Sequence, residues 1–155
     1  MSSHINRKNQ PTMVNVGAKK ITHRVARARA IVSLPRAVLA EIENGDVQSK
    51  KGPVFQTAIV AGIMAAKRTR DLIPLCHPIP IEDCSIDISL RKQEVVIECS
   101  VEAHHKTGVE MEALTGAAVA ALTVYDMCKG YSHDIVIREI RLLEKRGGKS
   151  DYVSR

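Results

Sequence analysis

Aromatic residues are scarce in this chain. They make up 3% of the 155 residues, with no Trp and one Phe. Proteins that bind single-stranded nucleic acid use aromatic rings on which bases stack, so the scarcity argues against that class. The two segments that we predict as neighbouring strands, Ser85–Leu90 and Glu94–Ala103, contain no such ring. An RNA-binding module that uses a sheet surface, the main non-enzymatic alternative, is therefore disfavoured.

Cysteine pairs at metal-binding spacing and long apolar runs are also missing. No two of the four cysteines, Cys76, Cys84, Cys99 and Cys128, have C-x-x-C or metal-knuckle spacing, and no secretory signal precedes them. We therefore expect reduced thiols, no bound metal and a cytoplasmic location. The apolar run Thr57–Ala66 is too short to cross a bilayer, so we expect no membrane partner.

What the chain does have is an excess of positive charge. The formal net charge is +6 and the pI about 9.3, which indicates an anionic partner. Nucleic acid, phosphorylated metabolites and acidic surfaces all fit the charge alone. The length suits one domain with a sizeable core. We expect a disordered tail over 1–12, a single catalytic domain over 13–155 and a mobile C-terminal loop over 145–155.

The hydrophobic pattern predicts an α+β fold. Alternation predicts strands at 24–34, 85–90, 94–103 and 134–143, and helical signals mark 36–43, 53–71 and 108–128. In the first strand one predicted face holds Ala26, Ala28, Ala30 and Val32, and the other, a wet and basic face, holds Arg27, Arg29 and Ile31. Without the short helix at 36–43, the order is β-α-β-β-α-β, the ferredoxin-like split βαβ. This order predicts an antiparallel four-stranded sheet with helices on one face, plus one extra short helix.

The longest predicted helix, 108–128, carries acids near its start and almost no charge along its middle. Thr107 as N-cap with Glu110 three residues later fits a capping box, a structural role for Glu110. Glu112 follows Met111 and is predicted to face the apolar interior, where desolvation raises the pKa of a carboxyl group. Glu112 is therefore the better candidate for proton transfer near neutral pH.

The end of this helix carries Asp126 and Lys129, whose i, i+3 spacing puts them on one side. They form either a surface ion pair or an acid/base couple. Fourteen residues at 1.5 Å each place Glu112 and Asp126 roughly 21 Å apart, too far for one small molecule to touch both. We therefore predict a symmetric dimer with composite sites, in which the small residues Gly116, Ala117, Ala120 and Ala121 allow two copies of the helix to approach closely.

Three loop motifs are further candidates. Lys51-Gly52, just ahead of a helix, is either a phosphate contact or an exposed loop lysine. Cys76-His77, in a proline-rich loop, is read as a packed cysteine and a ligand-contacting or buried histidine, because a nucleophilic Cys needs its His in space. Gly147-Gly148-Lys149-Ser150 resembles the end of a P-loop, but Leu143 stands where the first glycine belongs, so we reject a nucleotidase.

Several of these segments together resemble one family, the cyclic pyranopterin monophosphate synthases (MoaC, protein C of molybdenum cofactor biosynthesis). The resemblance runs from about Met13 to Ser150 and is carried by distinctive motifs: LIPLCHP at 72–78, KTGVEMEAL at 106–114, YDMCK at 125–129 and GGKS at 147–150.

The resemblance implies a lyase that converts 3′,8-cyclic 7,8-dihydro-GTP to cyclic pyranopterin monophosphate and releases pyrophosphate. It implies a ferredoxin-like fold, a homohexamer built as a trimer of dimers with sites at dimer interfaces, and no redox cofactor. Magnesium accompanying the triphosphate is left open. The matching positions are Asp126, Lys129 and Lys51 as catalytic groups, and Leu75, Cys76, His77, Met111, Glu110, Glu112, Arg24 and Lys149 as substrate contacts.

Our hypotheses for roles are Asp126 with Lys129 as the proton-transfer couple, Lys51 on phosphate or as an acid, and His77 with Glu112 orienting the base. The chain also departs from the family pattern. Asn15 and Pro53 stand where the family usually has Asp, and Asp151 replaces a frequent Gly. None of these departures removes an expected catalytic group.

Overall fold

The structure, a computed structural model, describes residues 4–155. Its strands are β1 Thr22–Ser33, β2 Ile42–Glu43, β3 Asp46–Ser49, β4 Gly52–Pro53, β5 Asp83–Arg91, β6 Glu94–His105, β7 Val136–Arg146 and β8 Tyr152–Val153. Its helices are α1 Arg36–Leu39, α2 Val54–Lys67, α3 Thr69–Leu72 and α4 Glu110–Cys128. The presence of both helices and antiparallel strands confirms the predicted α+β class.

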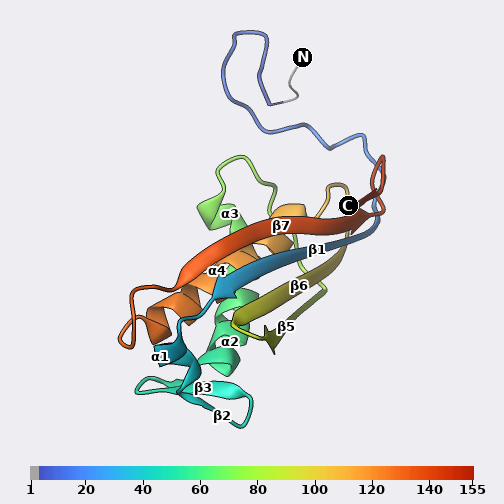
Figure 1. The fold of residues 1–155 in the computed structure, drawn as a ribbon. Helices are drawn as coiled ribbons and strands as arrows, with labels where there is room; N and C mark the ends of the chain where they lie inside the picture. The colour runs from blue at the N-terminus through green and yellow to red at the C-terminus, as the bar shows by residue number, and fades with distance from the viewer. Residues whose placement is uncertain (1–3) are drawn as a thin grey trace.

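One antiparallel sheet has the strand order β5-β6-β1-β7-β8, and helices α2 and α4 lie on one of its faces (Figure 1). It has one strand more than predicted, because Tyr152–Val153 adds β8 at the edge next to β7. The segment 145–155, predicted as a mobile loop, thus contains the end of β7 and all of β8; its mobility stays a prediction.

The alternation of β1 produces two different faces. Ala26, Ala28, Ala30 and Val32 are fully buried, as predicted, since alternate residues of a strand point to the same side. On the opposite face Arg27 pairs with Glu98 and Arg29 with Glu139, each at 2.9 Å. The predicted basic face of β1 is therefore neutralised by acids on β6 and β7.

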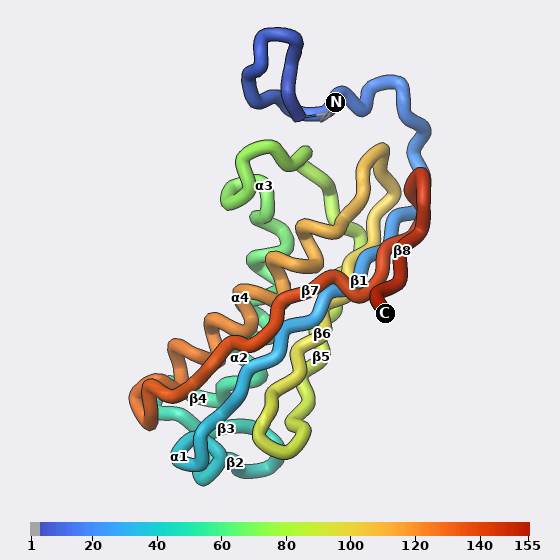
Figure 2. Tube along the Cα trace, turned by 45° about the horizontal axis from the view of Figure 1, so that its top comes forward, coloured from blue at the N-terminus to red at the C-terminus, as the bar shows by residue number. Residues whose placement is uncertain are grey.

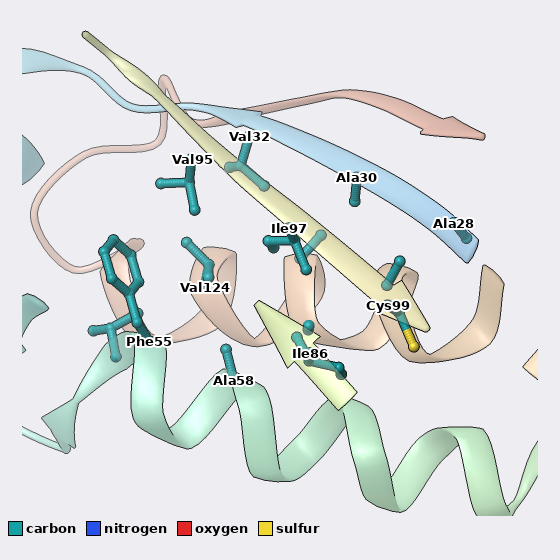
Figure 3. Close-up of a cluster of buried hydrophobic side chains, with 14 of the residues drawn as sticks. Ala28, Ala30, Val32, Phe55, Ala58, Ile86, Val95, Ile97, Cys99 and Val124 are labelled. Atoms are coloured by element: carbon teal, nitrogen blue, oxygen red, sulfur yellow. The ribbon is translucent and has the colours of Figure 1, made fainter. Parts of the chain in front are cut away.

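The core lies between the sheet and the two long helices (Figure 3). Where α2 crosses α4, a Cβ at Gly62 would lie 2.7 Å from the carbonyl oxygen of Gly116, and one at Gly116 would lie 2.7 Å from Cys99 Sγ. Small residues are required at this crossing. The prediction that Gly116, Ala117, Ala120 and Ala121 contact a second copy of the helix is wrong, because all four are buried within the chain, against α2 and the sheet.

The segment between β1 and α2 differs from its prediction. The helix expected over 36–43 ends at Leu39, and β2 and β3 form a hairpin through Asn44-Gly45, both with positive φ. Asn-Gly is typical of two-residue hairpin turns, because both positions need left-handed backbone. Between the predicted elements, where the sequence indicated no strand, Asp46–Ser49 forms β3, which also pairs with β4 in a small sheet of order β2-β3-β4.

The helix expected from Pro53 to Asp71 is divided in two. Arg68, at φ −111° and ψ 16°, interrupts it between α2 and α3. The Thr69 hydroxyl donates to the carbonyl of Ala66 at 2.9 Å, which stabilises the bend. Figure 2 shows α2 and α4 side by side and the N-terminal segment extending away from the sheet. Of the predicted tail, residues 1–3 lie outside the described residues.

Candidate active site

Three predicted residues meet at the C-terminal end of α4. Asp126 Oδ2 lies 2.8 Å from Lys51 Nζ, and Asp126 Oδ1 lies 2.8 Å from Lys129 Nζ. Lys129 is the first residue after α4, whereas Lys51 lies in the turn between β3 and β4. All three side chains are about half exposed, and they line a hollow of about 260 Å³ together with Lys50 and Tyr131.

The two lysines determine the charge state of this cluster. Hydrogen bonds from Lys129 and then Lys51 lower the pKa of Asp126 to about 2, and the same contact raises the pKa of Lys129. At neutral pH the carboxylate is therefore ionised and Lys129 is protonated. Two cations around one carboxylate leave an excess positive charge facing solvent, which suits an anionic ligand.

A second group of predicted residues lies at the opposite end of α4. Leu75, Cys76, His77, Glu110, Met111 and Glu112 line a hollow of about 340 Å³. Val14, Val16 and Lys19 of the N-terminal segment complete its wall. His77 Nε2 donates to the carbonyl oxygen of Val14 at 2.8 Å, and this bond fixes the orientation of the imidazole ring. The predicted loop and helix residues are thus brought together.

Glu112 is the buried acid of this second group. Only 4% of its surface is exposed, and burial raises its pKa to about 7, with the charge of Glu110 adding to the effect. It also lines a smaller hollow of about 250 Å³, where Lys67 and Arg70 provide positive charge. A carboxyl group that titrates near neutral pH can both give and accept a proton, as the sequence predicted for this residue.

Cys76 lies in the same wall, but its thiol is poorly suited to nucleophilic chemistry. Burial, and then the negative charges of Glu112 and Glu110, raise the pKa of Cys76. A reactive cysteine needs a lowered pKa, so this environment disfavours the thiolate. Among residues 4–155 no group of three or more His, Cys, Asp or Glu side chains is arranged to hold a metal ion.

Glu110 does not form the predicted capping box. The N-cap residue of α4 is Val109, and Thr107 lies outside the helix. The Glu110 carboxylate instead lies 3.2 Å from Lys145 Nζ on β7. The capping interpretation failed because the chain before α4 follows the end of β6 to His105 and turns only at Lys106–Val109. Glu110 is therefore free of a capping role and borders the hollow.

Arg24 and Lys149, both expected to contact the substrate, belong to segments near this end as well. Arg24 Nε and Nη2 donate to the carbonyls of His105 and Lys106, each at 3.3 Å, and so hold the chain that leads into α4. The turn at Gly147 packs onto β1, where the Thr22 hydroxyl donates to the Gly147 carbonyl at 2.6 Å. Lys149 is exposed in this turn. Whether either cation contacts phosphate stays a prediction.

The two groups occupy opposite ends of one uninterrupted helix, Glu110–Cys128. At 1.5 Å per residue, Glu112 and Asp126 are roughly 21 Å apart, as the sequence predicted. Sequence reasoning did not find Lys19 or the contact of Lys145 with Glu110. Lys19 lies in a segment without periodicity, and the Lys145 contact depends on strand pairing that only the fold determines.

None of the helices within residues 4–155 is both long and apolar enough to cross a membrane. A family model described as the MoaC family matches residues 13–148. A Xanthomonas oryzae pv. oryzae protein named cyclic pyranopterin monophosphate synthase is 51% identical over 150 residues, covering 96% of this chain and 91% of the relative.

Two longer proteins contain a similar region. The molybdenum cofactor biosynthesis bifunctional protein of Synechocystis sp. is 48% identical over 97% of this chain and 45% of its own length. Molybdenum cofactor biosynthesis protein 1 of Dictyostelium discoideum is 49% identical over 96% of this chain and 26% of its own length. In both, the matched region is one part of a larger polypeptide.

Proposed function

This chain belongs to the MoaC family, and we propose that it converts 3′,8-cyclic 7,8-dihydro-GTP to cyclic pyranopterin monophosphate with release of pyrophosphate. It is an enzyme of molybdenum cofactor biosynthesis. The observation that carries the proposal is the 51% identity to a synthase of that name over nearly the whole chain. We further propose that it works in the cytoplasm and without a redox cofactor.

The strand order supports the fold expected for this activity. We infer a ferredoxin-like core from the order β5-β6-β1-β7 and from α2 and α4 on one face, with β8 and the β2-β3-β4 sheet as additions. In this arrangement α2 links the two candidate regions. Lys51 lies just before β4, which leads into the helix, and the Leu75–His77 loop follows α3.

Lys51, Asp126 and Lys129 are the proposed catalytic groups. A substrate hydroxyl attacks the α-phosphorus, the bond from that phosphorus to the oxygen bridging to the β-phosphorus breaks, and pyrophosphate leaves with the electron pair. Lysines can stabilise the charge on the departing group. Because Lys51 and Lys129 hold the pKa of Asp126 near 2, the carboxylate is a weak base at rest. Phosphate that attracts Lys51 would raise that pKa and prepare Asp126 to accept a proton.

Glu112 and His77 are proposed to bind the heterocycle of the substrate. Glu112 can exchange protons near neutral pH and His77 is fixed by its bond to Val14, so both suit the rearrangement of the purine-derived ring. Leu75 and Met111 supply apolar contact on the same wall. Arg24 and Lys149 are proposed phosphate contacts. The proposal also allows a magnesium ion that enters bound to the triphosphate.

We propose that the two groups meet across a dimer interface. Met111, Leu114, Ala118, Leu122 and Tyr125 form a stripe on α4, with Leu122 56% and Met111 36% exposed. A two-fold axis across this stripe would place the start of one α4 opposite the end of its copy. Both composite sites would then form at once, and three such dimers would make the expected hexamer.

A pyrophosphate-release assay on the cyclic dihydro-GTP derivative tests the function. Lys51→Ala and Asp126→Asn should each lower kcat by about 10² to 10⁴, the range of general acid/base contributions. Lys92→Ala, which changes an exposed lysine on the distant turn between β5 and β6, is the matched control and should retain wild-type rates. Undiminished release in both site variants would refute the roles, and no release by the wild type would refute the activity.

A further inference from the structure

Lys51 lies in a turn whose backbone conformation is well defined. Ser49 pairs with Gly52 and Gln48 with Pro53, so Lys50 and Lys51 lie at the tip of the β3–β4 hairpin. The Ser49 hydroxyl accepts from the Lys51 amide at 3.1 Å and donates to the Gly52 carbonyl at 2.9 Å. Gly52 has φ +110°, which residues with a Cβ rarely adopt. The turn therefore fixes the direction of Lys51 relative to the hairpin.

The start of α2 takes its cap from another element. Its N-cap residue is Pro53, whose side chain has no hydrogen-bond acceptor, yet the first amides of a helix need acceptors. Asp46 on β3 supplies them. Its Oδ1 accepts from the Phe55 amide at 2.7 Å and its Oδ2 from the Gln56 amide at 3.2 Å. These are the second and third helical residues, the ones that an N-cap side chain normally serves.

The chain that carries Asp46 is also bonded to the turn after α4. Asp46 is 8% exposed. Burial raises the pKa of the Cys128 thiol at the end of α4 to about 11, and the charge of Asp46 adds to the effect. The Tyr131 hydroxyl donates to the Gln48 carbonyl at 3.1 Å. The hairpin is thus attached to the start of α2 and to the turn that follows Lys129.

We propose that Asp46 is a positioning residue that holds Lys51 against Asp126, in addition to capping α2. Because the capping acid belongs to the hairpin instead of to the helix, the two bonds that satisfy the helix amides also hold the base of the hairpin at the helix start. Lys51 can then reach Asp126 at 2.8 Å. The expected change in turnover rests on the proposed function, whereas the expected changes in stability and in the pKa of Asp126 do not.

The decisive test separates capping from positioning. Asp46→Ala removes both. The double variant Asp46→Ala/Pro53→Ser returns a capping hydroxyl to α2 at the N-cap position, which has extended backbone suited to Ser, but leaves the hairpin without its two bonds to the helix amides. Three quantities are measured for each: the thermal unfolding midpoint, the pKa of Asp126 from carboxyl carbon shifts in NMR, and kcat and KM for pyrophosphate release. Lys51→Ala gives the reference for a detached lysine.

Asp46→Ala should lower the midpoint by about 2–4 °C, the usual effect of losing a helix cap in a chain of this size. The double variant should recover most of that loss. In both, the pKa of Asp126 should rise to its value in Lys51→Ala, and kcat should fall about tenfold or more because a catalytic group is misplaced. Asp46→Asn, which keeps one acceptor, should be intermediate in all three quantities.

The possible failures are distinguishable. If Pro53→Ser restores the Asp126 pKa together with the midpoint, Asp46 is a helix cap only and the positioning proposal is wrong. If the pKa rises but turnover is unchanged, Asp46 positions Lys51 and the catalytic role of Lys51 fails. If Asp46→Ala does not fold, Tyr131→Phe detaches the other side of the hairpin and should raise the Asp126 pKa in part; an unchanged pKa there and in Asp46→Asn would overturn the proposal.

Discussion

The two ends of α4 place carboxylates in opposite environments. At the start, Glu112 is buried and its pKa is raised to about 7; at the end, Asp126 is exposed between two lysines and its pKa is lowered to about 2. Residues of nearly identical chemistry thus differ in protonation because of solvent access and neighbouring charge alone. Glu112 can exchange a proton near neutral pH before any ligand binds. Asp126 can accept a proton only after an incoming anion has drawn a lysine away from it.

The strongest test of this comparison asks whether the ends work together. Lys51→Ala disables only the C-terminal end and His77→Ala only the N-terminal end. Each variant alone should be nearly inactive. After dissociation and reassociation as a mixture, about a quarter of wild-type pyrophosphate release should return, because half of the dimers are mixed and each carries one intact composite site. No recovery, with exchange of subunits verified by mass, would show that each site lies within one chain.

The buried end should make stability depend on pH. The pKa of Glu112 rises from 4.5 in the unfolded chain to about 7 in the folded one, so the folded protein retains a proton that the unfolded chain releases. Stability should therefore fall as pH rises from 4.5 to 7 and level off above, by a total on the order of 3 kcal/mol. Urea unfolding at several pH values measures this.

Glu112→Gln should remove that slope, and at pH 8 it should be more stable than the wild type. Glu110→Gln is the matched control, since that acid is more exposed and its removal should leave most of the slope in place. A slope that persists in Glu112→Gln would mean that another group titrates in this pH range.

The helix crossing between the two ends can be tested by adding a methyl group. Gly116→Ala would bring a Cβ to 2.7 Å from Cys99 Sγ and 3.3 Å from the Gly62 carbonyl oxygen, so we expect a loss of about 1–3 kcal/mol in unfolding free energy. Gly130→Ala is the control, because nothing lies within 4 Å of its added Cβ. Equal stability of the two variants in urea would contradict the close approach.

The smallest expected effect concerns the exposed end. Asp126 should titrate near pH 2 in NMR, and its pKa should rise more in Lys129→Ala than in Lys51→Ala, since Lys129 has the larger influence. Because the folded pKa is lowered, the ion pairs contribute fully above pH 3.8 and lose their effect as pH falls towards 2. The reverse order of the two variants would show that Lys51 dominates.

The sequence predicted well the features that depend on periodicity, such as the buried face of a strand and distances along a helix. The alternation of Ala26 to Val32 located the buried face of β1, and the fourteen-residue interval between Glu112 and Asp126 gave the separation of the two ends. Long motifs also pointed to groups that lie together: Lys51, Asp126 and Lys129 were proposed as one set, and both lysines lie within hydrogen-bonding distance of Asp126. Their catalytic roles stay a prediction.

Contacts between elements could not be read in the same way. The cap of α2 by Asp46 and the pairing of Glu110 with Lys145 join residues whose distance depends on how strands and helices are arranged. The small residues around Gly116 were assigned to a dimer contact although they pack against α2, because a small-residue pattern does not reveal which helix approaches it. The β2–β3 hairpin was not predicted, because residues 36–43 were assigned to one short helix.

The crossing of α2 and α4 at Gly62 and Gly116 also limits how the chain can vary in length. Inserting one residue in either helix would rotate everything beyond it by about 100° and move it by about 1.5 Å, which would separate Lys51 from Asp126 or Leu75 from Glu112. We therefore expect insertions and deletions among relatives to fall outside 54–67 and 110–128, with both helices retaining their number of residues even where the connecting loops differ.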